Sequence, residues 1–145
     1  MKKILVIHGP NLDLLGEREP HLYGRETLAE LNAALVAEAQ ALGLSLETVQ
    51  SNHEGVLIEQ LHRARHVADA VILNPAGLTH TSVCLRDAVA AMPIPVIAVH
   101  LSNPAAREEF RRTDLIAPVC RGVVAGLGRE SYLAAVRAFA AFPPA

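Results

Sequence analysis

Aromatic side chains, positive charge and cysteine are all scarce in this sequence, and each shortage excludes a class of protein. Aromatic residues make up 3% of the 145 residues, and the formal net charge is −2. The chain therefore lacks both the basic surface and the stacking rings of a nucleic-acid-binding protein, and we expect no nucleic-acid partner. Its two cysteines, Cys84 and Cys120, have neither metal-site spacing nor the density of a disulfide-rich scaffold, which favours a reducing compartment.

Long hydrophobic runs are absent as well. No run approaches the ~20 consecutive apolar residues that a membrane-spanning helix requires, so we expect no membrane association. The apolar stretch after Lys3 is too short for the hydrophobic region of a signal peptide, and it leads directly into Gly9 and Pro10. We therefore expect a cytoplasmic protein.

Lysine is scarce as well, because Lys2 and Lys3 are its only copies and both lie at the start of the chain. A Schiff-base enzyme needs a desolvated interior lysine. A P-loop needs lysine between glycine and serine or threonine. Neither chemistry can be built from this sequence.

A metal site is the next possibility that the sequence raises. His62 and His66 lie four residues apart, so on a helix they would share a face and could contact one ion. No third ligand has a matching spacing, and Arg63 and Arg65 lie beside them. We interpret the pair as exposed helix histidines and expect neither a metal nor another cofactor.

The remaining composition is that of a globular enzyme-sized domain. Hydrophobic residues make up 51% of the chain, and we expect residues 1–145 to form a single catalytic domain. Short β-rich runs alternate with helical patterns, which predicts βαβ units. The expected strands are 3–8, 44–50, 70–73, 96–99 and 119–125, and the expected helical segments are 28–42, 56–67, 81–91, 105–112 and 131–141. This order predicts a flavodoxin-like, doubly wound five-stranded parallel sheet with helices on both faces.

In such a sheet, ligands bind beyond the carboxyl ends of the strands. The segments that follow the first, third and fourth expected strands are unusually polar. The first of them, residues 9–26, is about 18 residues long, well beyond an ordinary connection, which predicts a lid or binding loop. We therefore place the chemistry in these three segments.

Tyr23 in the long loop is either an amphipathic surface residue or a base. A phenol has an ordinary pKa near 10, and ionising it at pH 7 costs about 4 kcal/mol. One guanidinium about 4 Å away supplies about that much at an effective dielectric constant of about 20. Because Arg18 and Arg25 share the loop with Tyr23, an arginine–tyrosine pair could form a phenolate base.

His100, at the end of the fourth expected strand, is either a structural hydrogen-bonding residue or an acid–base group. Ser102 and the backbone N–H groups of the turn before Pro104 could hold a carboxylate. His80 lies in the facing segment. A nucleophile at Ser82 or Cys84 is a further alternative, although the apolar neighbours of Cys84 favour a buried core cysteine.

Six motifs follow one another over nearly the whole chain: residues 9–20 with Tyr23-Gly24 and Thr27-Leu28; Ser51-Asn52-His53-Glu54-Gly55; Asn74-Pro75 with Thr79-His80-Thr81-Ser82; Arg86-Asp87; His100-Leu101-Ser102-Asn103; and Arg107-Glu108 with Phe110-Arg111. Together they resemble type II 3-dehydroquinate dehydratase. The resemblance implies a lyase of the shikimate pathway that removes water from 3-dehydroquinate, giving 3-dehydroshikimate without a metal or a Schiff base. It also implies a flavodoxin-like subunit in a homododecamer built from trimers.

The resemblance also implies a role for each site residue, in an anti elimination through an enolate. Tyr23, ionised beside Arg18, is the base. Asn11 stabilises the enolate through a bound water, and His100 is the acid that protonates the departing hydroxyl. The implied substrate contacts are Asn74, Leu101 and Ser102 to the carboxylate, His80 and Arg111 to ring hydroxyls, and Asp87 across a subunit interface.

Three positions depart from the family pattern. Ala98 stands where a glutamate is usual, two residues before His100 and therefore on the same face of the strand. Leu78 replaces a usual tyrosine, and Asp13 replaces a common asparagine. We expect the acidic partner to titrate at a lower pH than in relatives with the glutamate. Ala98 also favours an alternative, a catalytically silent domain of the same fold that binds a hydroxylated carboxylate.

Overall fold

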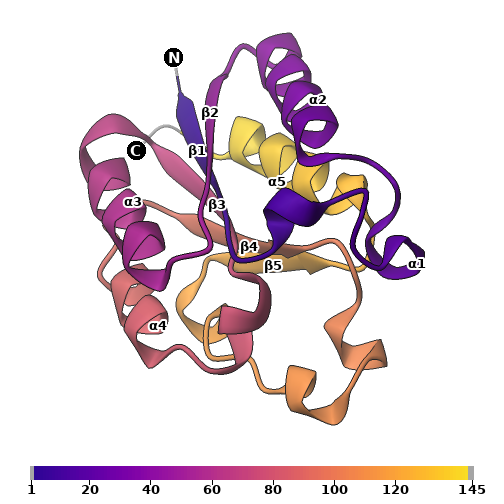
Figure 1. The fold of residues 1–145 in the computed structure, drawn as a ribbon. Coiled ribbons are helices and arrows are strands. Elements are labelled where there is room, and N and C mark those ends of the chain that lie inside the picture. Colours follow the sequence, from indigo (N-terminus) through magenta and orange to yellow (C-terminus); the bar gives the residue numbers. More distant parts are fainter. Residues whose placement is uncertain (1, 144–145) are drawn as a thin grey trace.

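The computed structural model describes residues 2–143, which fold around a five-stranded sheet (Figure 1). The strands are β1 (Lys3–His8), β2 (Ser45–Gln50), β3 (Ala70–Asn74), β4 (Val96–His100) and β5 (Gly122–Ala125). All neighbouring pairs are parallel, and the order across the sheet is β2-β1-β3-β4-β5. This is the flavodoxin-like order, so the predicted fold class is confirmed.

Helices cover both faces of the sheet. They are α1 (Pro20–Tyr23), α2 (Leu28–Ala41), α3 (Glu54–Val67), α4 (Val83–Ala90) and α5 (Arg129–Ala141). Helices α2 and α5 lie on one face, while α3 and α4 lie on the other (Figure 1). Within residues 2–143, no helix combines the length and the apolar character needed to cross a membrane.

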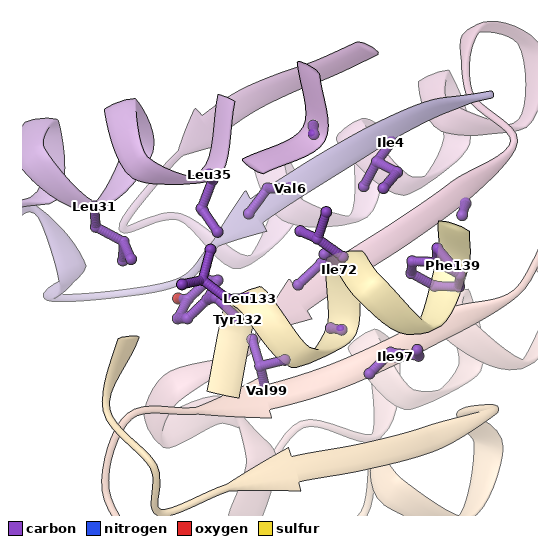
Figure 2. Packing of buried hydrophobic residues seen from close by; sticks show 14 of the residues in the cluster. Ile4, Val6, Leu31, Leu35, Ile72, Ile97, Val99, Tyr132, Leu133 and Phe139 are labelled. Carbon is purple, nitrogen blue, oxygen red and sulfur yellow. The ribbon is translucent and has the colours of Figure 1, made fainter. Parts of the chain in front are cut away.

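The alternation of side chains along β1 explains why there are two cores. Ile4 and Val6 pack against α2 and α5, and Figure 2 shows this cluster. Leu5 and Ile7 belong to the second cluster, with residues of α3 and α4. Successive strand residues point to opposite faces, so a strand covered on both sides must be apolar throughout. Every residue of β3 and β4 is buried, as this requires.

Two helix starts follow from their capping residues. The Thr27 hydroxyl accepts a hydrogen bond from the Glu30 backbone N–H at 3.2 Å. It also donates to the Glu30 carboxylate at 3.0 Å, so the two residues form a variant of the capping box in which the carboxylate bonds the hydroxyl. At the start of α4, Ser82 is the capping residue, because its Oγ accepts from the Leu85 N–H. Both caps satisfy N–H groups that a helix leaves free at its start.

Several predicted boundaries were wrong. The single helix expected over 105–112 is two 3₁₀ turns, Pro104–Ala106 and Glu109–Arg112. The strand expected from residue 119 begins at Gly122, because residue 119 belongs to another 3₁₀ turn, Ala117–Val119. A proline in the first positions of that turn favours it over a strand. Helices α3 and α5 each begin two residues before the predicted 56 and 131.

Cys84 is also not the core residue that the sequence predicted. It is exposed on α4, as is Val83 beside it. The buried stripe of α4 is formed by Leu85, Ala88 and Val89. Cys84 lies in the first turn, to the side of that stripe, so the apolar neighbours in sequence do not surround it in space.

Candidate active site

The carboxyl ends of the strands form a cleft of about 180 Å³. Ligand pockets for drug-sized molecules start at about 300 Å³, so this cleft suits a molecule of about one ring. Nine of the ten site residues named from the sequence line it: Asn11, Arg18, Tyr23, Asn74, His80, His100, Leu101, Ser102 and Arg111. They come together because parallel strands end at one edge of the sheet.

At the base of the cleft, the backbone that follows β1 lies unusually close to the backbone at the end of β3. The Gly9 N–H donates to the Asn74 carbonyl at 2.8 Å, and a Cβ on Gly9 would lie 2.7 Å from the same oxygen. Only glycine allows this approach between the ends of β1 and β3. Asn11 follows with φ +71°, a left-handed conformation that asparagine tolerates, and its N–H donates to the Asn52 side chain at 2.8 Å.

Tyr23 lies between two arginines. The guanidinium carbon of Arg18 is 5.0 Å from the centre of the Tyr23 ring, and that of Arg107 is 5.2 Å from it. Both distances are within the range of a cation–π contact. Tyr23 is half-buried. Arg25, named from the sequence as a second possible partner, is exposed and does not line the cleft.

Arg107 was not named as a site residue, although it lines the cleft. Its side chain is only 10% exposed, and it donates a hydrogen bond to the Ser102 Oγ at 3.1 Å. The only sequence signal was its place in the Arg107-Glu108 motif. Its position depends on the 3₁₀ turn Pro104–Ala106 folding back toward the long loop, which no local pattern reveals.

The loop 9–26 is fixed at its far end. The Arg129 Nε of α5 donates to the Glu26 carboxylate at 3.2 Å. Gly16 and Gly24 have φ values of +92° and +83°, and they bracket the part of the loop that carries Arg18 and Tyr23. The loop thus turns sharply at both glycines and holds these two side chains over the cleft.

His100 is buried, with 7% of its surface exposed, and its Nε2 has no hydrogen-bond partner among the described residues. Burial lowers the pKa of His100 from its ordinary value, because it disfavours the imidazolium. The negative charge of Asp114 opposes that change in pKa, and the charge of His80 adds to it. Ala98 on the same strand face contributes no carboxylate, so Asp114 is the acid that acts on His100.

His80 and Arg111 form the opposite wall. The His80 Nδ1 lies 2.7 Å from the Thr113 carbonyl oxygen. A carbonyl only accepts, so Nδ1 carries a hydrogen. The Arg111 Nε donates to the Glu108 carboxylate at 3.0 Å, and this contact lowers the pKa of Glu108. The Nε2 of His80 is therefore the ring nitrogen left for a bound molecule, and Arg111 offers a cation.

The structure does not bring Asp87 to the other nine residues. Its side chain is 62% exposed on α4, where it forms an ion pair with Arg86 at 2.9 Å. It does not line the cleft. Asp87 therefore does not contribute to the cleft of its own chain.

Neither candidate nucleophile lines the cleft. The Ser82 Oγ accepts from the Leu85 N–H and donates to the Glu54 carboxylate at 2.6 Å, so it caps α4. Cys84 lies on the outer side of the same helix. His62 and His66 are exposed, and residues 2–143 contain no group of three or more His, Cys, Asp or Glu arranged to hold a metal.

Comparison with known proteins gives consistent matches over the full length. The family model described as dehydroquinase class II matches residues 2–140. The 3-dehydroquinate dehydratase of Roseiflexus castenholzii is 56% identical over 92% of this chain and 85% of the relative. That of Desulforudis audaxviator is 55% identical, over 94% of this chain and 91% of the relative. The crystal structure of a type II dehydroquinase from Propionibacterium acnes matches with a TM-score of 0.95 at 39% identity, covering 98% of both chains.

Proposed function

The chain belongs to the class II dehydroquinase family, and we propose that it eliminates water from 3-dehydroquinate through an enolate, with Tyr23 as base and His100 as acid. Membership of this family makes it an enzyme, a hydro-lyase of the shikimate pathway. The observation that carries the mechanism is the placement of Tyr23 between two guanidinium groups in the cleft that also contains His100.

The first step is proton abstraction by Tyr23. The phenolate oxygen takes the proton from the carbon next to the ketone, and the electron pair of the broken C–H bond moves into the enolate. Arg18 and Arg107 contact the ring at 5.0 and 5.2 Å, so the charge of the base would develop beside two positive charges. Since no interior lysine exists to activate the ketone as an imine, the enolate oxygen must be stabilised by hydrogen bonds. We assign that role to Asn11, acting through a bound water.

The second step is loss of the tertiary hydroxyl. The enolate electrons form the new double bond, the C–O bond breaks, and His100 gives its proton to the departing oxygen, which leaves as water. The proton that Tyr23 holds then returns to solvent, and His100 takes up a proton from solvent, which restores the base and the acid. His100 must be protonated for this step, so Asp114 supports the reaction by opposing the fall in the His100 pKa that burial causes.

The substrate contacts follow from the walls of the cleft. We assign the substrate carboxylate to Asn74 and to the turn at Leu101 and Ser102, at the buried end of the cleft. His80 and Arg111 contact ring hydroxyls from the opposite wall. The exposed Asp87 reaches the cleft of a neighbouring copy, in a homododecamer built from trimers. Sizing by light scattering tests this assembly, and a monodisperse monomer would contradict it.

Residues 1–145 act as one catalytic domain, in the cytoplasm and without a cofactor. The free thiols of Cys84 and Cys120 are compatible with that reducing compartment.

The deciding experiment is an assay with 3-dehydroquinate that monitors the conjugated-enone absorbance of the product. We expect turnover at neutral pH that survives both borohydride with substrate and a chelator. Sensitivity to borohydride would indicate an imine, and sensitivity to the chelator a metal. Ala98 supports one alternative, a silent domain that binds a hydroxylated carboxylate, because it leaves His100 without its usual partner. Binding of 3-dehydroquinate by calorimetry without any absorbance change would favour that alternative.

A further inference from the structure

Four polar side chains from four different elements form a continuous chain beneath the cleft. The His8 Nε2 lies 2.8 Å from the Asn32 Oδ1, and the His8 Nδ1 lies 3.0 Å from the Tyr132 Oη. The Asn74 Nδ2 lies 2.9 Å from the same Oη. His8 and Tyr132 are completely buried, and Asn74 is 3% exposed. Figure 2 shows Tyr132 extending from α5 toward the sheet.

One backbone N–H determines the direction of every hydrogen bond in this chain. The Ala76 N–H donates to the Asn74 Oδ1 at 3.0 Å, so the Nδ2 end of the Asn74 amide must face Tyr132. Tyr132 therefore accepts from Asn74, and its own hydrogen is directed to the His8 Nδ1. His8 consequently carries its hydrogen on Nε2 and donates it to Asn32.

The chain of hydrogen bonds also requires a neutral His8. An imidazolium would place a hydrogen on Nδ1, opposite an oxygen that already accepts from Asn74, and the Tyr132 hydrogen would then lose its partner inside the core. Burial lowers the pKa of His8 to about 4, so the ring is neutral near pH 7. The directions derived from Ala76 therefore hold under working conditions.

Asn74 is the end of this chain that lines the cleft. Its Oδ1 is directed at Ala76, and one N–H of its Nδ2 is used by Tyr132. The second N–H of that nitrogen is the group left for a bound molecule. Asn74 can thus offer the cleft a donor, while one lone pair of its Oδ1 is already used by the Ala76 N–H.

We propose that Tyr132 and His8 are positioning residues that hold Asn74 as a hydrogen-bond donor to the cleft, so that this end of the site selects a carboxylate over groups that donate. The inference rests on the proposed function, since it takes the carboxylate of 3-dehydroquinate as the group at Asn74. It adds residues that touch no substrate and act only through Asn74.

The test compares Tyr132→Phe with Phe139→Leu. Tyr132→Phe removes only the hydroxyl, and it leaves Asn74 with the Ala76 contact alone. We expect the KM for 3-dehydroquinate to rise ~10-fold while kcat stays within about 2-fold, the loss expected for one hydrogen bond to a charged group. Phe139→Leu disturbs the same core cluster from the same helix without touching the polar chain, and it should leave KM unchanged. Equal KM changes in both variants would overturn the proposal.

Selectivity gives a second kinetic readout. A carboxylate inhibitor should bind wild type more tightly than its carboxamide analogue, and Tyr132→Phe should reduce that ratio ~5- to 10-fold because Asn74 is no longer held at both ends. An unchanged ratio would contradict the positioning role. If Tyr132→Phe does not fold, Asn32→Ala at the outer end of the chain replaces it, with an expected ~2-fold rise in KM. No change in KM for Asn32→Ala would then overturn the proposal.

A spectroscopic measurement tests the direction of the bonds without any turnover. Nitrogen-15 NMR of histidine-labelled wild type, with His8 assigned by the His8→Asn variant, should show His8 neutral with its hydrogen on Nε2. A hydrogen on Nδ1 would overturn the proposal even in an active enzyme. The proposed function fails differently: if Asn74→Asp leaves KM unchanged, the carboxylate does not bind at Asn74, whatever the His8 tautomer.

Discussion

The buried end of the cleft and its catalytic side differ in how completely their polar groups are paired. Asn74, Tyr132 and His8 use their side-chain groups in one chain of hydrogen bonds. The His100 Nε2 has no partner among residues 2–143, and the Tyr23 ring contacts two cations. The two regions therefore differ in their preparation for substrate. The groups assigned to binding are held in place by hydrogen bonds within the protein, while those assigned to proton transfer keep unused hydrogen-bonding capacity for the substrate.

The largest expected effect is at the catalytic side, in Tyr23→Phe. Removing the hydroxyl removes the base but keeps the ring between its arginines, so we expect kcat to fall about 10⁴-fold, the upper range for an acid–base group. Steady-state kinetics would measure kcat, and calorimetry with 3-dehydroquinate should show binding within about 3-fold of wild type. If the variant keeps a tenth of its activity, the base lies elsewhere.

Next in size are the two cations that flank the ring. Arg18→Ala and Arg107→Ala should each lower kcat about 10³-fold, with a smaller change in KM, because each removes a positive charge that contacts the proposed base. Arg112→Ala is the matched control, since Arg112 is exposed on the same 3₁₀ turn as Arg111 and lies outside the cleft. A normal kcat for Arg107→Ala would assign the activation of Tyr23 to Arg18 alone.

For His8, in the hydrogen-bonded chain beneath the cleft, the expected effect is on the free energy of unfolding rather than on the reaction rate. The pKa of His8 is about 4 in the folded protein and near 6.5 unfolded, so between these values the unfolded chain binds more protons. Stability is therefore complete above pH 6.5 and falls as the pH drops toward 4, by about 3 kcal/mol from this group.

Urea unfolding at pH 7.5 and pH 4.5 would measure this contribution. His8→Asn should lose the part of the pH dependence that His8 contributes and keep the part from the buried His100, whereas His53→Asn, at an exposed histidine, should keep all of it. Identical pH dependence in wild type and His8→Asn would mean that His8 is not held neutral by the core.

The smallest expected effect concerns the charge near His100. Asp114→Asn keeps an oxygen for the Ile116 and Ala117 N–H groups but removes the negative charge, so the pKa of His100 should fall further. Because activity needs the imidazolium, the loss of activity with rising pH should begin at lower pH, with a roughly few-fold lower kcat at pH 7. Ala98→Glu adds a negative charge on the same strand face as His100, so the loss of activity with rising pH should begin at higher pH. Unchanged limbs in both variants would remove Asp114 from this role.

The fold was largely predictable because its signals are local. The apolar strands and the Thr27 capping box each depend on a few neighbouring residues, and nine site residues gathered because parallel strands end together. The failures were features that depend on distant contacts. Cys84 has apolar neighbours in sequence, but its burial depends on how α4 is rotated against the sheet.

The same reason explains which parts of the site the sequence missed. Arg107 reaches Tyr23 only because two segments far apart in the chain fold over each other. Nothing local connects His8, Asn74 and Tyr132, which come from two strands and a helix. The directions of their hydrogen bonds follow only from three-dimensional contacts. The proposed contact of Asp87 with substrate requires a second copy of the chain, which a single chain does not show.

The two arginines beside Tyr23 belong to different parts of the molecule. Arg18 lies in the same loop as the ring, between Gly16 and Gly24, whereas Arg107 lies beyond β4 and is nearly buried. An outward swing of that loop would carry Arg18 along with Tyr23 and leave Arg107 behind. Tyr23 would then have one neighbouring cation in solvent instead of two over the cleft, so its reactivity would be coupled to enclosure of the substrate, and an open molecule would have little capacity for unwanted proton abstraction.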